Sequence, residues 1–327
     1  MVTSRLATNN NHDIPTQDPA FSRRQFITST AAGLTASVAL PSIAAVGTLP
    51  EFANDNAILQ GITIKVADQS QLDSMIQFLE NGFECQVLRR RIRGPIEETW
   101  MGFGPEQLSI PDSFQPPVSS LASYGGHASI HIVYDKTITN PLYRVGDSTP
   151  PGDNIAYLQL GVPEYRISQM VKSGGTILDA YGYVNVISPS GLPIRGIVGL
   201  VPDPIMFVAI RCASVEESRA FYQQLGFVEQ EYPYARPSKG MGQFEPPQPA
   251  KSVYMAPSAN CMGVLLLPTQ KRKKQPTINP VVEGLNLVYN PLPDAGEDDV
   301  PRLVDPSGVA IGFQSVRQFE EVEKITR

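Results

Sequence analysis

The clearest pattern in this chain is a run of apolar residues at helical spacing between an apolar strand and a Gly-Phe pair. It occurs first over residues 66–83, where apolar positions recur at i, i+3, i+4 and i+7. This spacing places the apolar side chains on one face, so it predicts an amphipathic helix packed against a core. The positions concerned are Leu72, Met75, Ile76 and Leu79.

A second copy of the pattern ends at Gly226-Phe227, as the first ends at Gly82-Phe83. Ser214 precedes the second helix and is predicted to cap it, because a serine oxygen accepts a hydrogen bond from a first-turn amide. Both glycines are predicted to follow their helices in the left-handed conformation, which glycine adopts without a Cβ clash. Two copies of one unit indicate an internal repeat and a modular fold. The second apolar face consists of Val215, Tyr222 and Leu225.

A turn signature also occurs twice. Ser188-Pro189-Ser190-Gly191 and Asp305-Pro306-Ser307-Gly308 both place proline second and glycine fourth, which suits a type I turn. Apolar residues follow at 194–198 and 309–313, so each turn is predicted to lead into a closing strand.

The order helix, Gly-Phe, strand pair, Pro-x-Gly turn and closing strand resembles the vicinal oxygen chelate superfamily of glyoxalases, bleomycin-resistance proteins and extradiol dioxygenases. The resemblance implies an α+β fold of βαβββ modules, two of which close each cupped mixed sheet. We place four modules, the last of them shortened. Neighbouring modules are expected to pair, within one chain or by exchange between two chains of a homodimer. An unrelated α+β protein with similar turns is the alternative. The modules span 61–134, 155–199, 206–268 and 284–314, which gives a first glyoxalase-like domain at 58–200, a second at 203–318 and a C-terminal tail at 319–327.

Residues 1–45 resemble a twin-arginine targeting segment. Arg23 and Arg24 precede a mildly apolar stretch at 27–39 and a run of small residues at 41–45. We therefore expect export of the folded protein by the twin-arginine route, into a bacterial periplasm or a thylakoid lumen. An Ala-rich leader without a targeting role is the alternative. The apolar stretch is interrupted by Thr and Ser and is too short to cross a membrane, so no transmembrane segment is expected.

Composition narrows the class of protein. The net charge of −6 argues against a general nucleic-acid-binding protein. The 30 prolines and 26 glycines among 327 residues indicate many loops between short strands. The three cysteines have no CxxC spacing, which excludes a zinc ribbon and a thioredoxin-like motif. Cys212 and Cys261 fall in one module and can form a disulfide in an oxidising compartment; three buried thiols, including Cys85, are the alternative.

The resemblance implies a divalent metal in each catalytic cup, held by His, Gln or Glu from the first and last strands of the paired modules. Here His131 is the only histidine at such a position, and no carboxylate occupies one. We therefore expect no cofactor; a divalent metal held in the first cup by His131, Gln159 and an unaligned acid is the alternative. GxSxG, HExxH, Walker and GxGxxG motifs are also missing. The positions compared are Gly61, His131, Tyr157, Arg195, Phe207, Leu265, Leu285 or Asn286, and Gly312.

Alternate residues of the predicted strands face inward, so the first cup is expected to bring together a set of polar and cationic side chains. Lys and Arg attract carboxylates while Tyr and Gln fix orientation, which predicts a small anionic or polar ligand. Rim positions for Lys65 and Arg195 in surface ion pairs are the alternative. The second cup, around Phe207 and Ala209, is expected to be packed core. The ligand-binding candidates are Lys65, His131, Tyr157, Gln159 and Arg195.

Arg89, Arg91 and Arg93 share one face of the strand that follows the first helix. That face suits an anionic lipid or an acidic partner, but a solvated face paired with Glu97 and Glu98 is the default interpretation.

We therefore predict an exported, glyoxalase-like, non-catalytic protein that binds a small anionic or polar ligand or docks onto an exported or thylakoid complex. The missing carboxylates favour this interpretation over a metal-dependent lyase or dioxygenase-type enzyme with an atypical site in the first cup. Stoichiometric bound metal that is lost on His131→Ala would decide for the enzyme.

Overall fold

Each of the four predicted modules contributes its first strand to the centre of a sheet in the computed structural model. The predicted targeting segment, with Arg23 and Arg24, lies outside the described residues. None of the described helices is long and apolar enough to cross a membrane. The structure describes residues 52–103, 128–137, 155–162, 167–180, 183–198, 204–233, 248–257, 262–269, 282–291 and 303–325, all of which belong to one unit at 44–327.

The first module is built around helix α2, which begins at a polar cap. The Asp68 carboxylate accepts a hydrogen bond from the Gln71 amide at 2.8 Å, which satisfies one of the free amides of the first turn. The apolar face predicted for this helix is buried, as expected. The elements are β1 (Phe52–Val66), α2 (Gln69–Phe83), β2 (Gln86–Arg93), β3 (Ile96–Gly102) and β4 (Ser129–Asp135).

The second and third modules repeat this order. Ser214 caps α5 as predicted, with its Oγ accepting a bond from the Glu217 amide at 3.2 Å. Gly226 follows α5 with φ of 83°, also as predicted. The second module contains β5 (Ile155–Val162), α4 (Ile167–Lys172), β6 (Thr176–Ala180), β7 (Tyr183–Ile187) and β8 (Pro193–Val198). The third contains β9 (Ile205–Cys212), α5 (Val215–Gln224), β10 (Val228–Glu229), β11 (Val253–Ala256) and β12 (Gly263–Pro268).

The fourth module ends in a helix where the sequence predicts a tail from residue 319. Strands β13 (Val282–Pro291), β14 (Leu303–Val304) and β15 (Ala310–Ser315) lead directly into α6 (Val316–Glu323). A reciprocal pair of hydrogen bonds starts this helix: Gln318 N donates to Ser315 Oγ at 3.2 Å, and Ser315 N donates to Gln318 Oε1 at 3.0 Å. Residues 292–302 lie outside the described part, so the shortening of this module stays a prediction.

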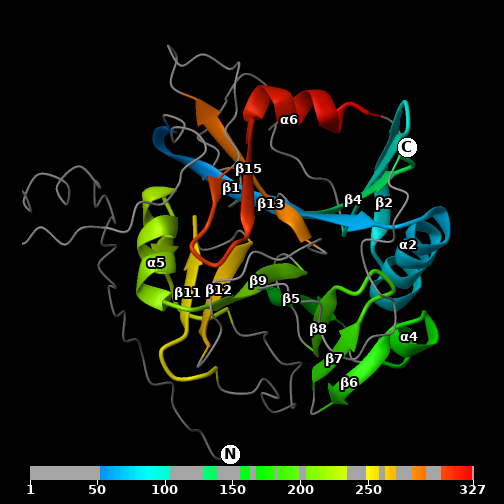
Figure 1. The fold of residues 1–327 in the computed structure, drawn as a ribbon, viewed down its shortest axis with the longest axis horizontal. Coiled ribbons are helices and arrows are strands. Elements are labelled where there is room, and N and C mark those ends of the chain that lie inside the picture. The colour runs from blue at the N-terminus through cyan, green and yellow to red at the C-terminus, as the bar shows by residue number, and fades with distance from the viewer. Residues whose placement is uncertain are drawn as a thin grey trace, which may run out of the picture. The chain divides into compact units, whose positions relative to one another are not determined.

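The strands form two mixed sheets, which confirms the α+β fold. Sheet A has seven strands in the order β14-β15-β13-β1-β4-β3-β2, and sheet B has eight in the order β10-β11-β12-β9-β5-β8-β7-β6. Sheet A therefore joins the first module to the fourth, and sheet B joins the second to the third. Blue β1 and orange β13 lie side by side in Figure 1, with Gly61 opposite Asn286. The predicted pairing of the first module with the second, and of the third with the fourth, is therefore wrong.

One predicted helix end is also wrong. Gly82 is still helical, and the left-handed residue after α2 is Glu84, with φ of 65°. A Cβ on Gly82 would lie 3.2 Å from Met170 Cα in α4. Gly82 therefore serves the close approach of two helices and does not serve as the helix stop.

Alternation along the strands divides buried apolar residues from polar ones. Ile62 and Ile64 of β1 are fully buried, whereas Thr63 between them and Lys65 beyond them point to the other face. One continuous apolar cluster joins side chains from both sheets with those of α2 and α5. Among the described residues, Cys85 and Cys212 are buried and form no disulfide, and Cys261 lies outside the described residues.

Helix–turn contacts tie neighbouring modules together across the sheets. Gln71 of α2 donates from Nε2 to the Pro189 carbonyl at 3.2 Å, which joins the first module to the turn of the second. Tyr222 of α5 donates to Asp305 Oδ2 at 3.1 Å, which joins the third module to the turn of the fourth. Gly191 and Gly308 end the two turns with φ of 86° and 90°, so the predicted turn signature is confirmed.

Candidate functional site

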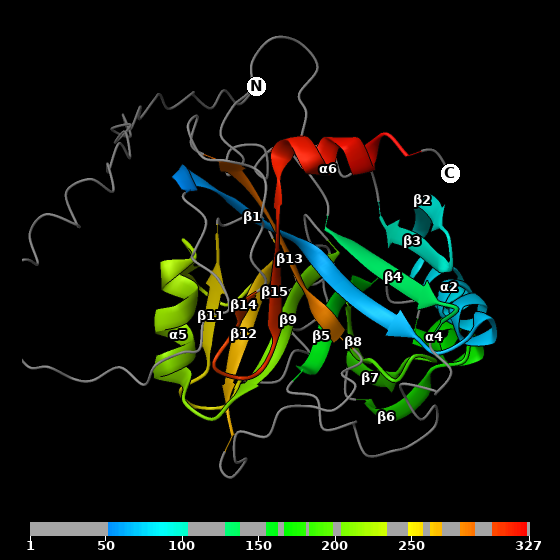
Figure 2. The ribbon, with the colours of Figure 1, turned by 45° about the horizontal axis from the view of Figure 1, so that its top comes forward.

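Sheet A carries polar side chains on the face away from the core, and a cavity of about 500 Å³ lies over them. Figure 2 shows the strands that build this face, with α6 across one end of them. We call this face cup A and define it by the central residues Thr63, Lys65 and His131. Successive side chains of a strand point to opposite faces of the sheet, so His131 faces cup A while its neighbours Ile130 and Ile132 point into the core.

A row of side chains crosses cup A from strand to strand. Arg89 of β2 is opposite Trp100 of β3, Trp100 is opposite His131 of β4, and His131 is opposite Thr63 of β1. The Trp100 and His131 rings stack with centroids 4.3 Å apart and planes at 6°. The Arg89 guanidinium lies 5.5 Å from the Trp100 ring and 5.9 Å from the Phe319 ring of α6. This row holds the imidazole in a fixed position.

His131 is also held by a hydrogen bond to one of its ring nitrogens. Asn286 of β13 donates from Nδ2 to Thr63 Oγ1 at 2.7 Å, and Thr63 Oγ1 lies 3.2 Å from His131 Nδ1. The other ring nitrogen, Nε2, lies 3.3 Å from Glu98 Oε1, which is ion-pair distance but off the line of a good hydrogen bond. Nδ1 of His131 is therefore engaged by Thr63, whereas Nε2 lies beside Glu98 without a hydrogen bond.

Glu98 is locked in a bidentate ion pair. Arg91 donates from Nε and Nη2 to its two carboxylate oxygens at 2.6 and 2.8 Å. Burial alone raises the pKa of Glu98, but hydrogen bonds and charge from His131 and Arg91 outweigh it and lower the pKa to about 2. Glu98 is thus a carboxylate at neutral pH, and its charge offsets that of Arg91.

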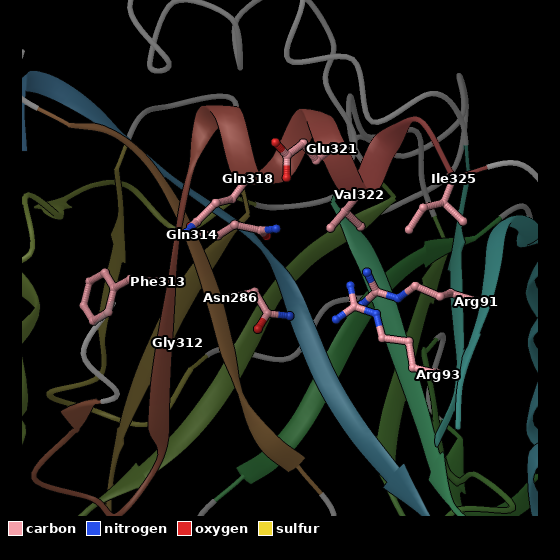
Figure 3. Close-up of a pocket in the computed structure, with 10 residues that line it drawn as sticks. All are labelled: Arg91, Arg93, Asn286, Gly312, Phe313, Gln314, Gln318, Glu321, Val322 and Ile325. Atoms are coloured by element: carbon pink, nitrogen blue, oxygen red, sulfur yellow. The ribbon is translucent and has the colours of Figure 1, made fainter. Parts of the chain in front are cut away.

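A second cavity of about 850 Å³ continues from cup A to α6. Figure 3 shows Arg91 and Arg93 of β2 pointing into it, opposite Val322 and Ile325. Asn286 lines this cavity as well as the first one. The two cavities therefore form one continuous site between β2, β13, β15 and α6.

Arg93 differs from Arg91 in its surroundings. It is exposed, and within the described ranges no carboxylate lies at ion-pair distance from it. Glu321 of α6 lines the same cavity but is not among the ion-pair partners of either arginine. The charge of Arg93 is therefore available to a ligand.

The side chains of cup A do not fit a tightly held divalent metal. Sheet A brings together Gly61, His131, Asn286 and Gly312, the positions to which the resemblance assigns ligands, and Thr63 lies opposite His131. Only His131 is a usual ligand, and its Nδ1 is already engaged by Thr63. Across the described residues, no three His, Cys, Asp or Glu side chains come close enough to hold an ion.

The matching face of sheet B is filled with aromatic side chains. Phe207 is fully buried and packs against Tyr157, Tyr232 and Tyr254. Gln159 is fully buried too, and its Oε1 accepts a bond from Tyr232 at 3.4 Å. The expectation that the surroundings of Phe207 are packed core is confirmed.

The five predicted ligand-binding residues do not form one site. Lys65 and His131 face cup A, whereas Tyr157, Gln159 and Arg195 belong to sheet B. Arg195 lies 3.8 Å from the Tyr157 ring and donates to the side chain of Asn185, and no carboxylate of the described residues lies at ion-pair distance from it. The physical reason for the separation is the pairing of the first module with the fourth.

The sequence pointed to Glu98 only as a partner of the arginine strand, and it did not point to Trp100 or Phe319. Glu98, Trp100 and Phe319 face cup A, but they belong to the second hairpin strand and to α6, not to the strands that the resemblance assigns to ligands. The alternation of Arg89, Arg91 and Arg93 was a usable signal. The neighbouring strand of the same hairpin must present its own alternate residues to the same face as these arginines.

Comparison with solved structures places the fold. Glyoxalase I from Zea mays matches with 15% identity and a TM-score of 0.59, over 82% of this chain and 95% of that one. A mutant form of the same maize protein matches with 15% identity and a TM-score of 0.58, over 83% of this chain and 97% of that one. No protein-family model and no curated protein sequence matches. At this identity the likeness establishes a shared glyoxalase fold.

Proposed function

We propose that this chain is a glyoxalase-fold protein that binds a small polar or anionic molecule in cup A without a metal. The observation that carries the proposal is the hydrogen-bond chain from Asn286 through Thr63 to His131. His131 and Asn286 stand at positions to which the resemblance assigns metal ligands, and Thr63 joins them by hydrogen bonds. An ion held through His131 Nδ1 would have to break this chain and leave polar atoms unpaired.

The size and lining of the cavities support a small-molecule site. Volumes of about 500 and about 850 Å³ suit a ligand of modest size. Lys65, Arg91 and Arg93 contribute cations, and the amides of Asn286 and Gln314 contribute neutral donors and acceptors. Such fixed polar groups around a preformed hollow give orientation and specificity.

We also propose export of the folded protein by the twin-arginine route, on the strength of Arg23 and Arg24 and the apolar stretch after them. The test is a full-length chain carrying Arg23→Lys and Arg24→Lys, followed by fractionation of the cells. Retention of the double variant with export of the native chain supports the route. Equal export of both would refute it. Docking onto an exported complex stays a prediction.

Metal binding provides the direct test of the site. The folded protein is incubated with Zn²⁺, Ni²⁺, Mn²⁺ or Fe²⁺, desalted and analysed for bound metal, beside His131→Ala. We expect far less than one ion per chain in both. One ion per chain in the native protein, lost in His131→Ala, would overturn the metal-free site and favour a lyase or dioxygenase-type enzyme.

A further inference from the structure

We propose that the ligand of cup A is an organic acid with an apolar body, with its carboxylate at Arg91 and Arg93 and its body beneath α6. This proposal rests on the proposed small-molecule function of cup A. The chemistry follows from the two opposite walls of the larger cavity, one carrying guanidinium groups and the other carrying aliphatic side chains (Figure 3).

The cationic wall suits a carboxylate. Arg91 and Arg93 are two residues apart on β2, so both point to the same face. Arg91 donates from Nε and Nη2 to Glu98, which leaves Nη1 for a ligand. The Glu98 carboxylate offsets the charge of Arg91. Arg93 has no ion pair among the described residues and offers a planar fork of donors that matches a carboxylate. Arg93 is therefore the guanidinium that favours an anionic group, and Glu321, the carboxylate that lines the same cavity, does not pair with it.

The opposite wall suits an apolar body. Val322 and Ile325 are only partly buried and line the cavity, and Phe319 lines the adjoining hollow. Covering such surface removes it from water, which favours an alkyl or aryl group over a fully polar molecule. Asn286 and Gln314 line the same cavity and can bond a polar substituent.

The α6 wall of the site is fixed in place by contacts within the protein. Ser315 and Gln318 cap the helix reciprocally at the end of β15, and buried Phe319 packs toward the Arg89 guanidinium. The Gln318 amide already has its acceptor, so this helix start is poorly suited to a phosphate, which binds free first-turn amides. A rigid apolar wall facing two guanidinium groups therefore favours an apolar carboxylic acid over a phosphate.

Intrinsic fluorescence provides the assay, because Trp100 is the single tryptophan of the chain and lies in cup A. The full chain is titrated with acetate, butyrate, hexanoate, octanoate and phenylacetate, with hexanol and inorganic phosphate as controls. We expect affinity to rise roughly fourfold per added methylene up to the length of the apolar wall. Hexanol and phosphate are expected to bind at least about tenfold more weakly than hexanoate.

Two variants separate the walls. Arg93→Gln should weaken hexanoate about tenfold and leave hexanol unchanged, since it removes the charge from an exposed position. Arg90→Gln is the matched control, because Arg90 is exposed on the opposite face of β2. Val322→Ser should weaken hexanoate several-fold but not acetate. Circular dichroism of each variant checks that the fold is retained.

The outcomes are distinguishable. Equal affinity for acetate and hexanoate, or equal effects of Arg93→Gln and Arg90→Gln, would overturn the amphipathic acid. If other polar molecules then bind and perturb Trp100 fluorescence, the proposed function stands without this ligand class. Absence of binding by every acid and by a wider panel of polar metabolites would overturn both.

Discussion

Replacing Asp305 by asparagine is expected to remove a pH-dependent cost of folding. Asp305 is buried in the turn before β15, where Oδ1 accepts bonds from the Ser307 and Val309 amides at 2.9 and 2.7 Å. Tyr222 donates to its other oxygen at 3.1 Å. Burial raises the pKa of Asp305 from 3.8 to about 6, although the bonds from Val309, Tyr222 and Ser307 lower it.

The size of the effect follows from the two states of this carboxyl group. Between about pH 4 and about pH 6 the folded protein holds a proton that the unfolded chain has lost. Folding takes up a proton in that window, so the contribution of Asp305 to stability falls as the pH rises. A pKa difference of about 2 corresponds to a cost of about 3 kcal/mol in the free energy of unfolding. This cost is absent below about pH 4 and complete above about pH 6.

Urea unfolding of the native chain and Asp305→Asn, followed by circular dichroism across this pH range, measures the effect. Asparagine keeps the Oδ1 acceptor, and its amide nitrogen can donate to the Tyr222 hydroxyl. The free energy of unfolding of the variant, relative to the native chain, is expected to be about 3 kcal/mol higher at pH 7 than at pH 4. Asp73→Asn, at an exposed position of α2, is the matched control. A difference that stays constant with pH would refute proton uptake by Asp305.

Three further changes test other parts of the structure. Glu98→Gln is expected to lose less stability than the native chain as the pH falls from about 4.5 to about 2, because the stability that the lowered pKa of Glu98 contributes is full above about pH 4.5 and is lost by about pH 2. Acid titration of both proteins, followed by circular dichroism, measures this, and coincident curves would contradict it. Phe319→Ala is expected to cost about 3 kcal/mol in urea unfolding and to release α6 to proteolysis, and a variant as resistant as the native chain would contradict this packing role. Gly82→Ala is expected to cost about 1–3 kcal/mol, because its Cβ meets Met170 Cα at 3.2 Å; an equal or higher melting temperature would show that α4 moves away freely.

Local patterns in the sequence predicted local structure well. The apolar stripe from Leu72 to Leu79, the Ser214 cap and the two Pro-x-Gly turns depend on neighbours within a few residues, and all are confirmed. The left-handed residue after α2 was predicted at Gly82 but is Glu84, because Gly82 allows the close approach of a helix nearly 90 residues away in the sequence. Sequence spacing does not reveal such contacts.

Strand partnership was not predictable from the same patterns. The first strands of the modules share alternating or continuous apolar character, which suits a sheet centre but does not choose between β5 and β13 as the partner of β1. The candidate site inherited this error, since Lys65 and His131 were grouped with Tyr157, Gln159 and Arg195. Glu98 was identified as a partner for the arginine strand, but its contact with His131 needed the register of β3 with β4.

The helix–turn contacts and the sheets together close the four modules into a ring. Helix–turn contacts join the first module to the second and the third to the fourth, while the sheets join the second to the third and the fourth to the first. The closing bond of cup A, from Asn286 to Thr63, spans 223 positions. During synthesis, cup A therefore stays open until the last module emerges, and β1 waits with an unpaired edge. A chain cut short before β13 would lack the part of cup A that β13, β15 and α6 supply, and it would present that edge to other chains.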